Sequence, residues 1–250
     1  MRYRVSTLDK EPGLRRHFER LHGVAWPPFL RDDAANALWP QLYDRFAAFQ
    51  IALVDGATRV VAIGNTIPFV WDRTPRGLPD RVADVIAAGI ATRERGLRPN
   101  TLSALAAVVD PRRRGEGLSA RVLTAMQGLA GAHGFRALVA PVRPSHKGRY
   151  PLTPMARYAA WTRADGQRFD PWLRVHEQLG ARFVRLTPRG NTVRATVAMW
   201  EERTGLKFPE TGRYVVPGAF APIVVDRATD RVRYDEANVW MLHPVRRTRR

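Results

Sequence analysis

The segment from Thr101 to Gly134 constrains the fold more than any other part of this chain. It begins with an apolar stretch, passes through the turn RRRGEG, and ends in a segment whose apolar residues recur at helical spacing. This order predicts a buried strand, a tight turn and an α-helix. The backbone N–H groups at a helix N-terminus, together with the helix dipole, favour a bound anion. We therefore expect a phosphorylated ligand at Arg112–Gly117.

The length and composition predict one α/β domain. The chain has 250 residues, no internal repeat and no linker-like segment, so we expect a single domain over 1–245 and a basic tail at 246–250. No apolar run approaches the ~20 residues of a membrane span. The chain has no cysteine, which excludes disulfides and cysteine catalysis. With no apolar signal segment at the start, these features favour a cytoplasmic protein.

The formal net charge of +18 raises the question of a polyanionic partner. Only three of the 41 basic residues are lysines, so the excess is carried by arginine. The arginines are scattered, and the dense clusters are Arg112–Arg114 and the tail. A solvated, arginine-rich surface is therefore the preferred interpretation, and a nucleic-acid-binding protein is kept as an alternative.

The segments before the central strand predict helices and a hairpin. Alternating residues near the N-terminus favour a strand, and Asp55-Gly56 between two apolar runs is typical of a hairpin. Apolar spacing predicts three helices. The expected elements are a strand at 2–8, helices at 14–21 and from Asp32 or Asp33 to Phe49, hairpin strands at 49–54 and 59–70, and a helix at 79–94.

The segments after the central helix predict a strand–helix–strand unit, an insertion and further strands. The apolar strand at 135–142 follows the helix closely, so it should lie parallel to the central strand. Residues 145–169 are rich in proline, arginine and aromatic residues and show no clean period. The remaining elements are a short helix at 154–161, helices at 170–179 and 192–203, and strands at 181–186, 214–216, 222–225, 232–234 and 239–242.

Three anion-binding motifs compete for the glycine turn. The phosphate loop of nucleoside triphosphatases is excluded because no lysine follows the glycines. The pattern Gly115-x-Gly117-x-x-Ala120 matches a dinucleotide fingerprint, but Arg143 follows the next strand where an acidic residue is expected. An NADP-dependent oxidoreductase stays open on this evidence.

The third motif fits better. Val109-x-Pro111-x-x-Arg114 and Arg112-x-x-Gly115-x-Gly117 resemble the acetyl-CoA signature of the GNAT superfamily of N-acetyltransferases. The expected element order also resembles that family over roughly residues 1–190 and one late strand, with an extra helix at 79–94. The resemblance implies a central mixed sheet with a βαβ acetyl-CoA-binding core, flanking helices and extra C-terminal strands. Acetyl-CoA or another acyl-CoA would be the co-substrate, without a metal.

The same resemblance implies a set of cofactor-binding residues. The strand before the turn would line the pantetheine arm, and the amides of the turn would hold the pyrophosphate. Arginines of the turn would add charge toward the 3′-phosphate. The implied residues are Ala107, Val108, Val109, Arg112, Arg114, Gly115, Glu116, Gly117, Leu118 and Ser119.

The catalytic end departs from the family pattern. In the segment Leu173–Ala181, His176 stands where the family usually has the tyrosine that protonates the leaving thiolate. His176 is one candidate acid; Tyr150 and Tyr158, in the insertion, are the others. We predict that 145–169 covers the active site and that Tyr158, Trp161 and Trp172 form a pocket. The candidate bases are single carboxylates: Asp165, Asp170, Glu201 and Glu202. The histidines lack the spacing of metal ligands.

These observations predict an acyl-CoA-dependent N-acyltransferase that acts on a small-molecule amine by direct transfer in a ternary complex. The alternatives are a nucleic-acid-binding protein and a GNAT fold that binds CoA without acyl transfer. The extra strands at 205–245 complete the sheet or pair with a second subunit in a homodimer.

Overall fold

The computed structural model describes residues 3–56 and 58–245, and the predicted basic tail lies outside them. In this part of the chain a nine-stranded sheet has the order β1-β2-β3-β4-β5-β9-β8-β7, and β6 pairs with β9. The strands are β1 (Arg4–Thr7), β2 (Gln50–Asp55), β3 (Arg59–Phe69), β4 (Thr101–Val109), β5 (Ala137–Val142), β6 (Arg182–Ala195), β7 (Gly212–Tyr214), β8 (Ile223–Asp226) and β9 (Arg231–His243).

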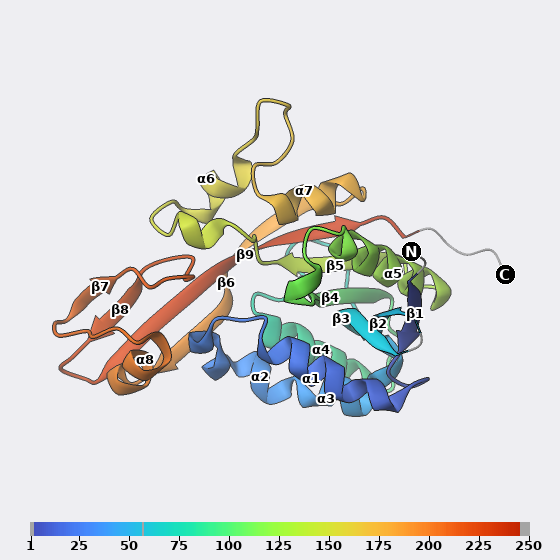
Figure 1. Cartoon of the computed structure of the whole chain (residues 1–250), viewed down its shortest axis with the longest axis horizontal. Coiled ribbons are helices and arrows are strands. Elements are labelled where there is room, and N and C mark those ends of the chain that lie inside the picture. The colour runs from blue at the N-terminus through green and yellow to red at the C-terminus, as the bar shows by residue number, and fades with distance from the viewer. Residues whose placement is uncertain (1–2, 57, 246–250) are drawn as a thin grey trace.

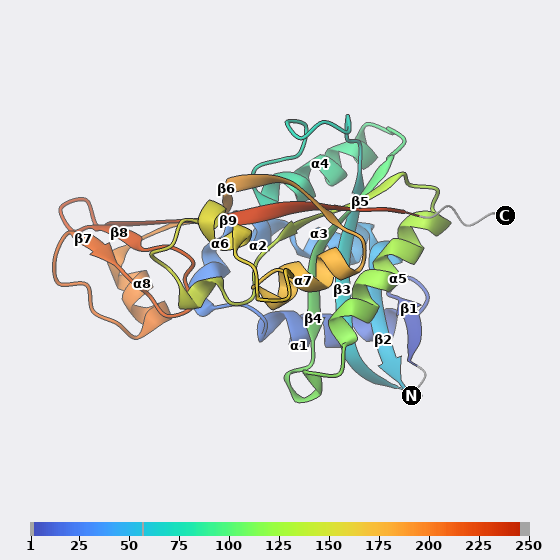
Figure 2. The same ribbon diagram turned by 90° about the horizontal axis from the view of Figure 1, so that it is seen from above.

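Helices cover both faces of the sheet. Figures 1 and 2 show α1 to α4 on one face and α5 and α7 on the other, while α8 lies with β7 and β8 at the far end of β9. The helices are α1 (Arg15–Gly23), α2 (Ala34–Leu38), α3 (Pro40–Arg45), α4 (Val82–Glu94), α5 (Leu118–Ala132), α6 (Met155–Ala160), α7 (Pro171–Gln178) and α8 (Val197–Thr204).

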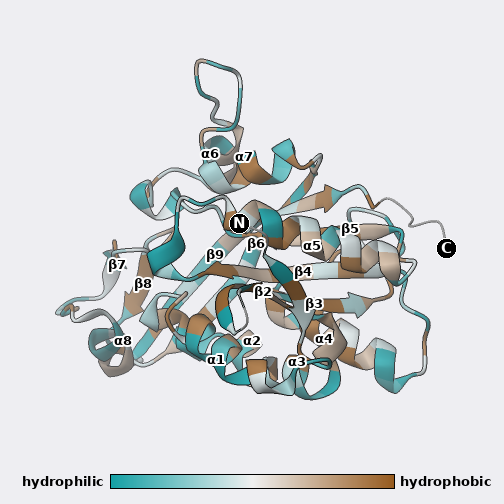
Figure 3. Ribbon diagram, turned by 45° about the vertical axis from the view of Figure 1, so that its right-hand side comes forward, coloured by the Kyte–Doolittle hydropathy of each residue, from teal (hydrophilic) through white to brown (hydrophobic). Residues whose placement is uncertain are grey.

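Each layer of helices encloses its own apolar core. Phe18, Leu42 and Ile86 are buried on one face of the sheet, and Val122 and Met126 of α5 are buried on the other. In Figure 3 apolar residues follow α5 and β9, and the loop that projects beside α6 is hydrophilic. A third buried cluster lies at the far end of β9, around Trp200 and Tyr234.

The central βαβ unit is confirmed. Strand β4 is antiparallel to β3 and parallel to β5, and α5 connects the two parallel strands. The predicted hairpin is confirmed as well, since β2 and β3 pair antiparallel. The mixed α/β sheet expected from the sequence is therefore the fold of this chain.

The two late strands predicted at 232–234 and 239–242 are wrong as separate elements, because β9 runs through both. Its central carboxylates do not interrupt it, since each has a partner: Glu236 is fully buried and paired with Arg143, and Asp235 pairs with Arg194. One edge of β9 pairs with β5 and then β8, and the other pairs with β6.

The helix predicted at 192–203 begins too early. Residues 192–195 belong to β6, where they pair with 232–235 of β9, and Val193 is buried. Helix α8 begins only after Thr196, whose hydroxyl accepts a hydrogen bond from the Met199 amide. Pairing with a distant strand therefore overrides the local helical spacing.

The helix predicted from Asp32 or Asp33 to Phe49 is divided. Asp33 caps α2, as expected, by accepting a hydrogen bond from the Ala35 amide. Helix α2 ends at Leu38 and α3 starts at Pro40, a residue that suits the first turn of a helix and disrupts its interior. In the part of the chain described here, no helix combines the length and apolarity needed to cross a bilayer.

Candidate active site

A cleft opens where β4 and β5 separate. The two strands pair only from Thr101 to Ser103, opposite 137–139. On its other edge β4 has a bulge at Leu105, because Asn65 pairs with Ala106 and Thr66 with Ala104. A cavity of about 650 Å³ lies between the diverging strands and extends to the turn before α5 and to α7.

The open edge of β4 offers unpaired backbone groups to this cavity. The Asp110 amide donates to the Val61 carbonyl on the β3 side. Since successive residues of a strand direct their amides to opposite edges, Val109 and Ala107 direct theirs toward the cleft. Ala107, Val108 and Val109 all line the cavity, as the sequence predicts.

The glycine turn ends at the same cavity. Gly115 and Gly117 have φ angles of 87° and 69°, and no atom lies within 4 Å of a Cβ built on either. Glycine is needed there for the left-handed backbone, and the space beside it is open. Gly117 caps the 15-residue helix α5, so the first amides and the positive end of the helix dipole face the cavity wall.

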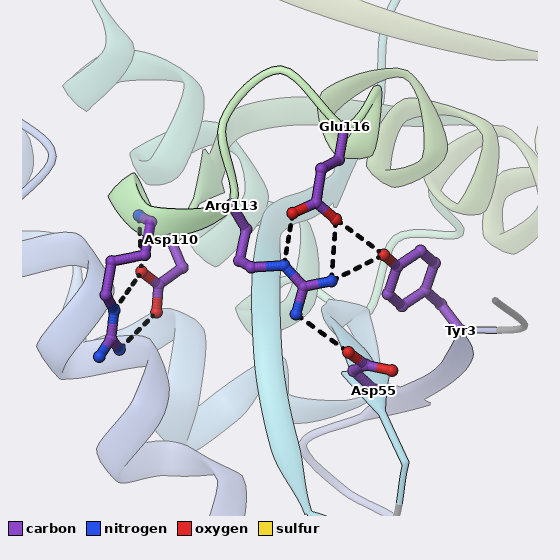
Figure 4. A network of polar contacts seen from close by, with 6 residues as sticks. Tyr3, Asp55, Asp110, Arg113 and Glu116 are labelled. Atoms are coloured by element: carbon purple, nitrogen blue, oxygen red, sulfur yellow. Dashed lines mark hydrogen bonds and ion pairs between the residues drawn. The ribbon is translucent and has the colours of Figure 1, made fainter.

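A network behind the turn holds it in place (Figure 4). The Arg113 guanidinium donates to both carboxylate oxygens of Glu116, at 2.6 and 2.8 Å, and to Asp55 at 3.0 Å. The Tyr3 hydroxyl completes the network at 3.0 Å from both Arg113 and Glu116. The side chain of Glu116 is thus engaged with Arg113, and Glu116 is not among the residues that line the cavity.

Arg112 also lies away from the cavity, contrary to the prediction. Its guanidinium donates twice to Asp110, at 3.2 and 3.1 Å, and its side chain is 72% exposed. These bonds hold the pKa of the Asp110 carboxyl at about 2. The arginines that line the cavity are Arg113, which the sequence prediction missed, Arg114 and Arg143. The other predicted cofactor residues at the cavity are Gly115, Gly117, Leu118 and Ser119.

His176 lines the cavity, but its environment does not suit an acid. It is 1% exposed, its Nδ1 lies 2.8 Å from His243 Nε2, and Trp172 packs against its ring at 4.4 Å. Burial lowers the pKa of His176 well below its ordinary value, with the neighbouring His243 as a second cause. Both imidazoles are therefore neutral at pH 7.

Tyr150 and Tyr158 do not reach the cavity. They pack with Trp161 and Phe169 in an aromatic cluster, and the buried Tyr158 hydroxyl donates to Asp170 at 2.7 Å. Burial raises the pKa of Tyr158 further above its ordinary value. The structure thus gives both tyrosines a packing role instead of the predicted acid role.

The segment 145–169 covers little of the cleft. Of this segment only Ser145 and His146 line the cavity, and Trp172 of α7 is the one aromatic residue of the predicted pocket that does. Figure 1 shows the loop between α6 and α7 projecting away from the sheet. Its base is fixed by Asp170, which caps α7 and accepts the amides of Ser145 and His146.

None of the predicted carboxylate bases lines the cleft. Asp170 is occupied as described above, Glu201 pairs with Lys207, and Asp165 pairs with Arg163. Within the described ranges, no group of three or more His, Cys, Asp or Glu residues is arranged to hold a metal ion.

A smaller polar chamber adjoins the cleft, and the sequence prediction missed it. The two cavities share Trp26, Leu105, Pro141 and Arg143 as walls. The smaller one has a volume of about 50 Å³, and its polar walls come from four separate parts of the chain: His22, Asp33, Asn36, Asn191 and Asn238. Only Asp33 was singled out from the sequence, as a helix cap.

Comparison with known proteins identifies the family. No family model matches the chain. Over 97% of its length the chain is 32% identical to the arginine N-acetyltransferase avaD of Aspergillus versicolor, and it covers 94% of that protein. The chain belongs to the GNAT superfamily of acyl-CoA N-acyltransferases, as the glycine-turn motif predicts. It is an N-acetyltransferase, and acetyl-CoA or another acyl-CoA is its co-substrate.

Two solved structures share the fold over nearly the whole chain. The loading GNATL domain of CurA from Lyngbya majuscula has a TM-score of 0.61 at 16% identity, with 98% of each chain covered. The GphF GNAT-like decarboxylase, solved in complex with isobutyryl-CoA, has a TM-score of 0.58 at 18% identity, with 98% of this chain and all of that chain covered. At these identities the similarity concerns the fold.

Proposed function

We propose that residues 1–245 act as one acyltransferase domain that moves an acetyl group from acetyl-CoA directly to the amino group of a small molecule. The observation that carries this proposal is the junction of the two cavities at Leu105 and Pro141. Each cavity can hold part of one reactant, and the two reactants would meet where the cavities join. Since the relative is named for arginine, arginine is the first acceptor to test.

The cleft offers a track for the co-substrate. The pyrophosphate would bind the amides of Gly115, Gly117 and Leu118, and Arg114 would add positive charge. The pantetheine arm would follow the open edge of β4, where its amides can pair with Ala107 and Val109. The thioester would then lie deepest in the cleft, at the junction.

The transfer needs little from the protein beyond position. The neutral amine attacks the thioester carbon, a C–N bond forms, and the C–S bond breaks as CoA leaves as a thiolate. A backbone N–H on the open edge of β4 would stabilise the oxyanion. We propose that solvent in the open cleft takes the proton that the amine nitrogen loses on attack and supplies one to the thiolate, and that the neutral His176 shapes the wall.

The proposal is tested by thermal unfolding with acetyl-CoA and by mass spectrometry of arginine incubated with the protein. At 100 times the dissociation constant, the co-substrate adds about 2.7 kcal/mol to the free energy of unfolding and raises Tm. The expected product is acetylarginine. A chain with no Tm shift in acetyl-CoA, CoA or longer acyl-CoAs contradicts the proposed co-substrate site.

A glycine pair separates cofactor binding from backbone strain. Gly117→Ala and Gly134→Ala both place a side chain at positive φ, 69° and 72°, and no atom lies within 4 Å of either new Cβ. Each should lose about 1–2 kcal/mol of stability. Only the first adds a methyl group at the cavity, so only Gly117→Ala should weaken CoA binding in calorimetry. Equal CoA affinity in the two variants would contradict the proposal that the pyrophosphate binds at this turn.

A further inference from the structure

The polar chamber beside the cleft has one buried carboxyl group, that of Asp33, for which the described residues supply no salt bridge. Asp33 is 6% exposed, and the groups that bind its two oxygens are the amides of Ala35 at 2.8 Å and Thr192 at 2.7 Å. Both donors are neutral, so they orient the carboxylate without cancelling its charge. Burial raises the pKa of Asp33, because desolvation disfavours its charged form. A cation bound beside the carboxylate would stabilise that charged form.

The other ionisable groups around the chamber are already balanced. Arg143 donates twice to Glu236, at 2.7 and 2.9 Å, and the Tyr234 hydroxyl donates to Glu236 as well. His22 accepts a hydrogen bond from Trp26, and burial lowers its pKa, so it is neutral at pH 7. Asp33 is therefore the acidic group of the chamber that a cationic ligand could pair with.

A second wall of the chamber offers an acceptor that has no donor. Asn238 is 1% exposed, and its Oδ1 has no hydrogen-bond partner among the described residues. Gly190 leaves room for this side chain, and the side-chain amide nitrogen of Asn238 donates to Asn191 Oδ1 at 3.3 Å, which orients it. A buried polar atom left without a partner is costly, which points to a hydrogen-bond donor on a ligand.

The size of the chamber limits what the donor can be. A water-sized group occupies roughly 10–15 Å³ in such a cavity, so about 50 Å³ holds about four heavy atoms. A guanidinium group has four, is planar, carries a positive charge and presents several N–H donors. It matches both the carboxylate of Asp33 and the oxygen of Asn238.

We propose that this chamber, with Asp33 and Asn238 as its specificity-determining residues, binds the guanidinium of the acceptor while the amine of the same molecule points through the junction at Leu105. This inference rests on the proposed function for the reaction, and it adds the chemical class of the acceptor: an amine that carries a guanidinium. The carboxylate selects the charge, and the Asn238 oxygen selects a donor.

Arginine and citrulline test this inference, because they share the reacting amine and nearly the same shape but differ in charge. With acetyl-CoA saturating, kcat/KM for arginine should exceed that for citrulline on the order of 100-fold, mostly through KM. In Asp33→Asn the arginine value should fall to that of citrulline. The matched control is Asp32→Asn, since Asp32 pairs with Arg203 outside the chamber and should leave both values unchanged.

A second variant keeps the test decisive if Asp33→Asn does not fold. Asn238→Leu removes the unpartnered oxygen at similar volume, and it should raise KM for arginine roughly tenfold. Calorimetric binding of arginine to the CoA-bound protein gives a readout that does not depend on turnover. Selective arginine binding without acetyl transfer to any amine would sustain the inference and overturn the proposed function.

Three results would overturn the inference itself. Citrulline could serve as well as arginine in the unaltered protein. Asp33→Asn and Asn238→Leu could both leave KM for arginine unchanged. Finally, the acetyl group could be found by fragment-ion mass spectrometry on a guanidino nitrogen, which would place that end of the substrate at the thioester.

Discussion

At the scale of single residues, neighbouring arginines in one turn have different surroundings. Arg112 is bound to Asp110, Arg113 is bound to Asp55 and Glu116, and Arg114 lines the cleft. The sequence RRR does not distinguish them, because which side chain meets a carboxylate depends on partners as far away as residue 55. Arg112 and Arg113 thus have carboxylate partners within the protein, and Arg114 is the arginine of this turn that we propose for contact with the ligand.

Arg114→Ala and Arg112→Ala separate these roles. Removing a charge-assisted contact to a phosphate should raise the Kd for CoA roughly tenfold in Arg114→Ala. Arg112→Ala should stay within about twofold of the unaltered protein, because its guanidinium is engaged with Asp110. Calorimetry with CoA and with 3′-dephospho-CoA measures both variants. Equal losses would mean that the charge of the whole turn matters rather than the position of Arg114.

At the scale of elements, local patterns predicted those parts of the fold that depend on neighbours in sequence. The apolar run, the glycines and the helical spacing correctly predicted β4, the turn and α5. The prediction failed at 192–195, where pairing with β9 decides the structure from about 40 residues away. Most residues predicted for the cofactor end line the cleft for the same reason, since they belong to this one continuous segment, and their role in binding stays a prediction.

The polar chamber was not predictable from the sequence. Asp33 comes from the start of α2, Asn191 from β6 and Asn238 from β9, so its walls meet only when the sheet is assembled. No spacing within one segment marks such a site. The aromatic residues of 145–169 predicted a pocket that they do not line, because aromatic side chains can pack against one another as well as against a ligand.

Lys147 shows how the 145–169 segment is fastened to the sheet. It is 1% exposed, and its ammonium donates to the carbonyls of Tyr150 and Phe220. Burial lowers its pKa to about 8. Lys147→Met would leave two buried carbonyls without this donor and should cost about 2 kcal/mol in urea unfolding.

Lys207→Met is the matched control for that variant. Lys207 is 83% exposed and pairs with Glu201, so its loss should cost less than about 0.5 kcal/mol. Faster trypsin cleavage after Arg149 in Lys147→Met alone would locate the effect in this segment. If both variants are equally stable, Lys147 does not fasten the segment.

At the scale of the whole molecule, the net charge of +18 suits an anionic co-substrate. A strongly positive protein attracts phosphate-bearing ligands at long range, an effect that salt screens. The sheet ends at β1 on one side and β7 on the other, and the homodimer through the late strands stays a prediction.

The pH dependence of global stability should report the buried His176–His243 pair. Burial lowers the pKa of His243 to about 4 and that of His176 well below its usual value. Below pH ~6.5 the two imidazoles bind protons in the unfolded chain but stay neutral in the folded chain. Their contribution to the free energy of unfolding is therefore complete above that pH and is lost on acidification toward pH 4. Between pH 7 and 5 the lowered pKa of His243 alone should reduce the free energy of unfolding by about 2 kcal/mol, and His176 should reduce it further.

A double variant isolates this contribution, because replacing both partners by apolar residues leaves no unpaired ring behind. His176→Phe combined with His243→Leu should flatten the fall in unfolding free energy between pH 7 and 5, measured by urea titration at each pH. His133→Gln, at an exposed position, should retain the full fall of the unaltered protein. A double variant that loses as much stability on acidification as the His133 control would mean that other buried groups set the acid sensitivity. In that case His176 could be protonated near neutral pH and would again be a candidate acid for the leaving thiolate.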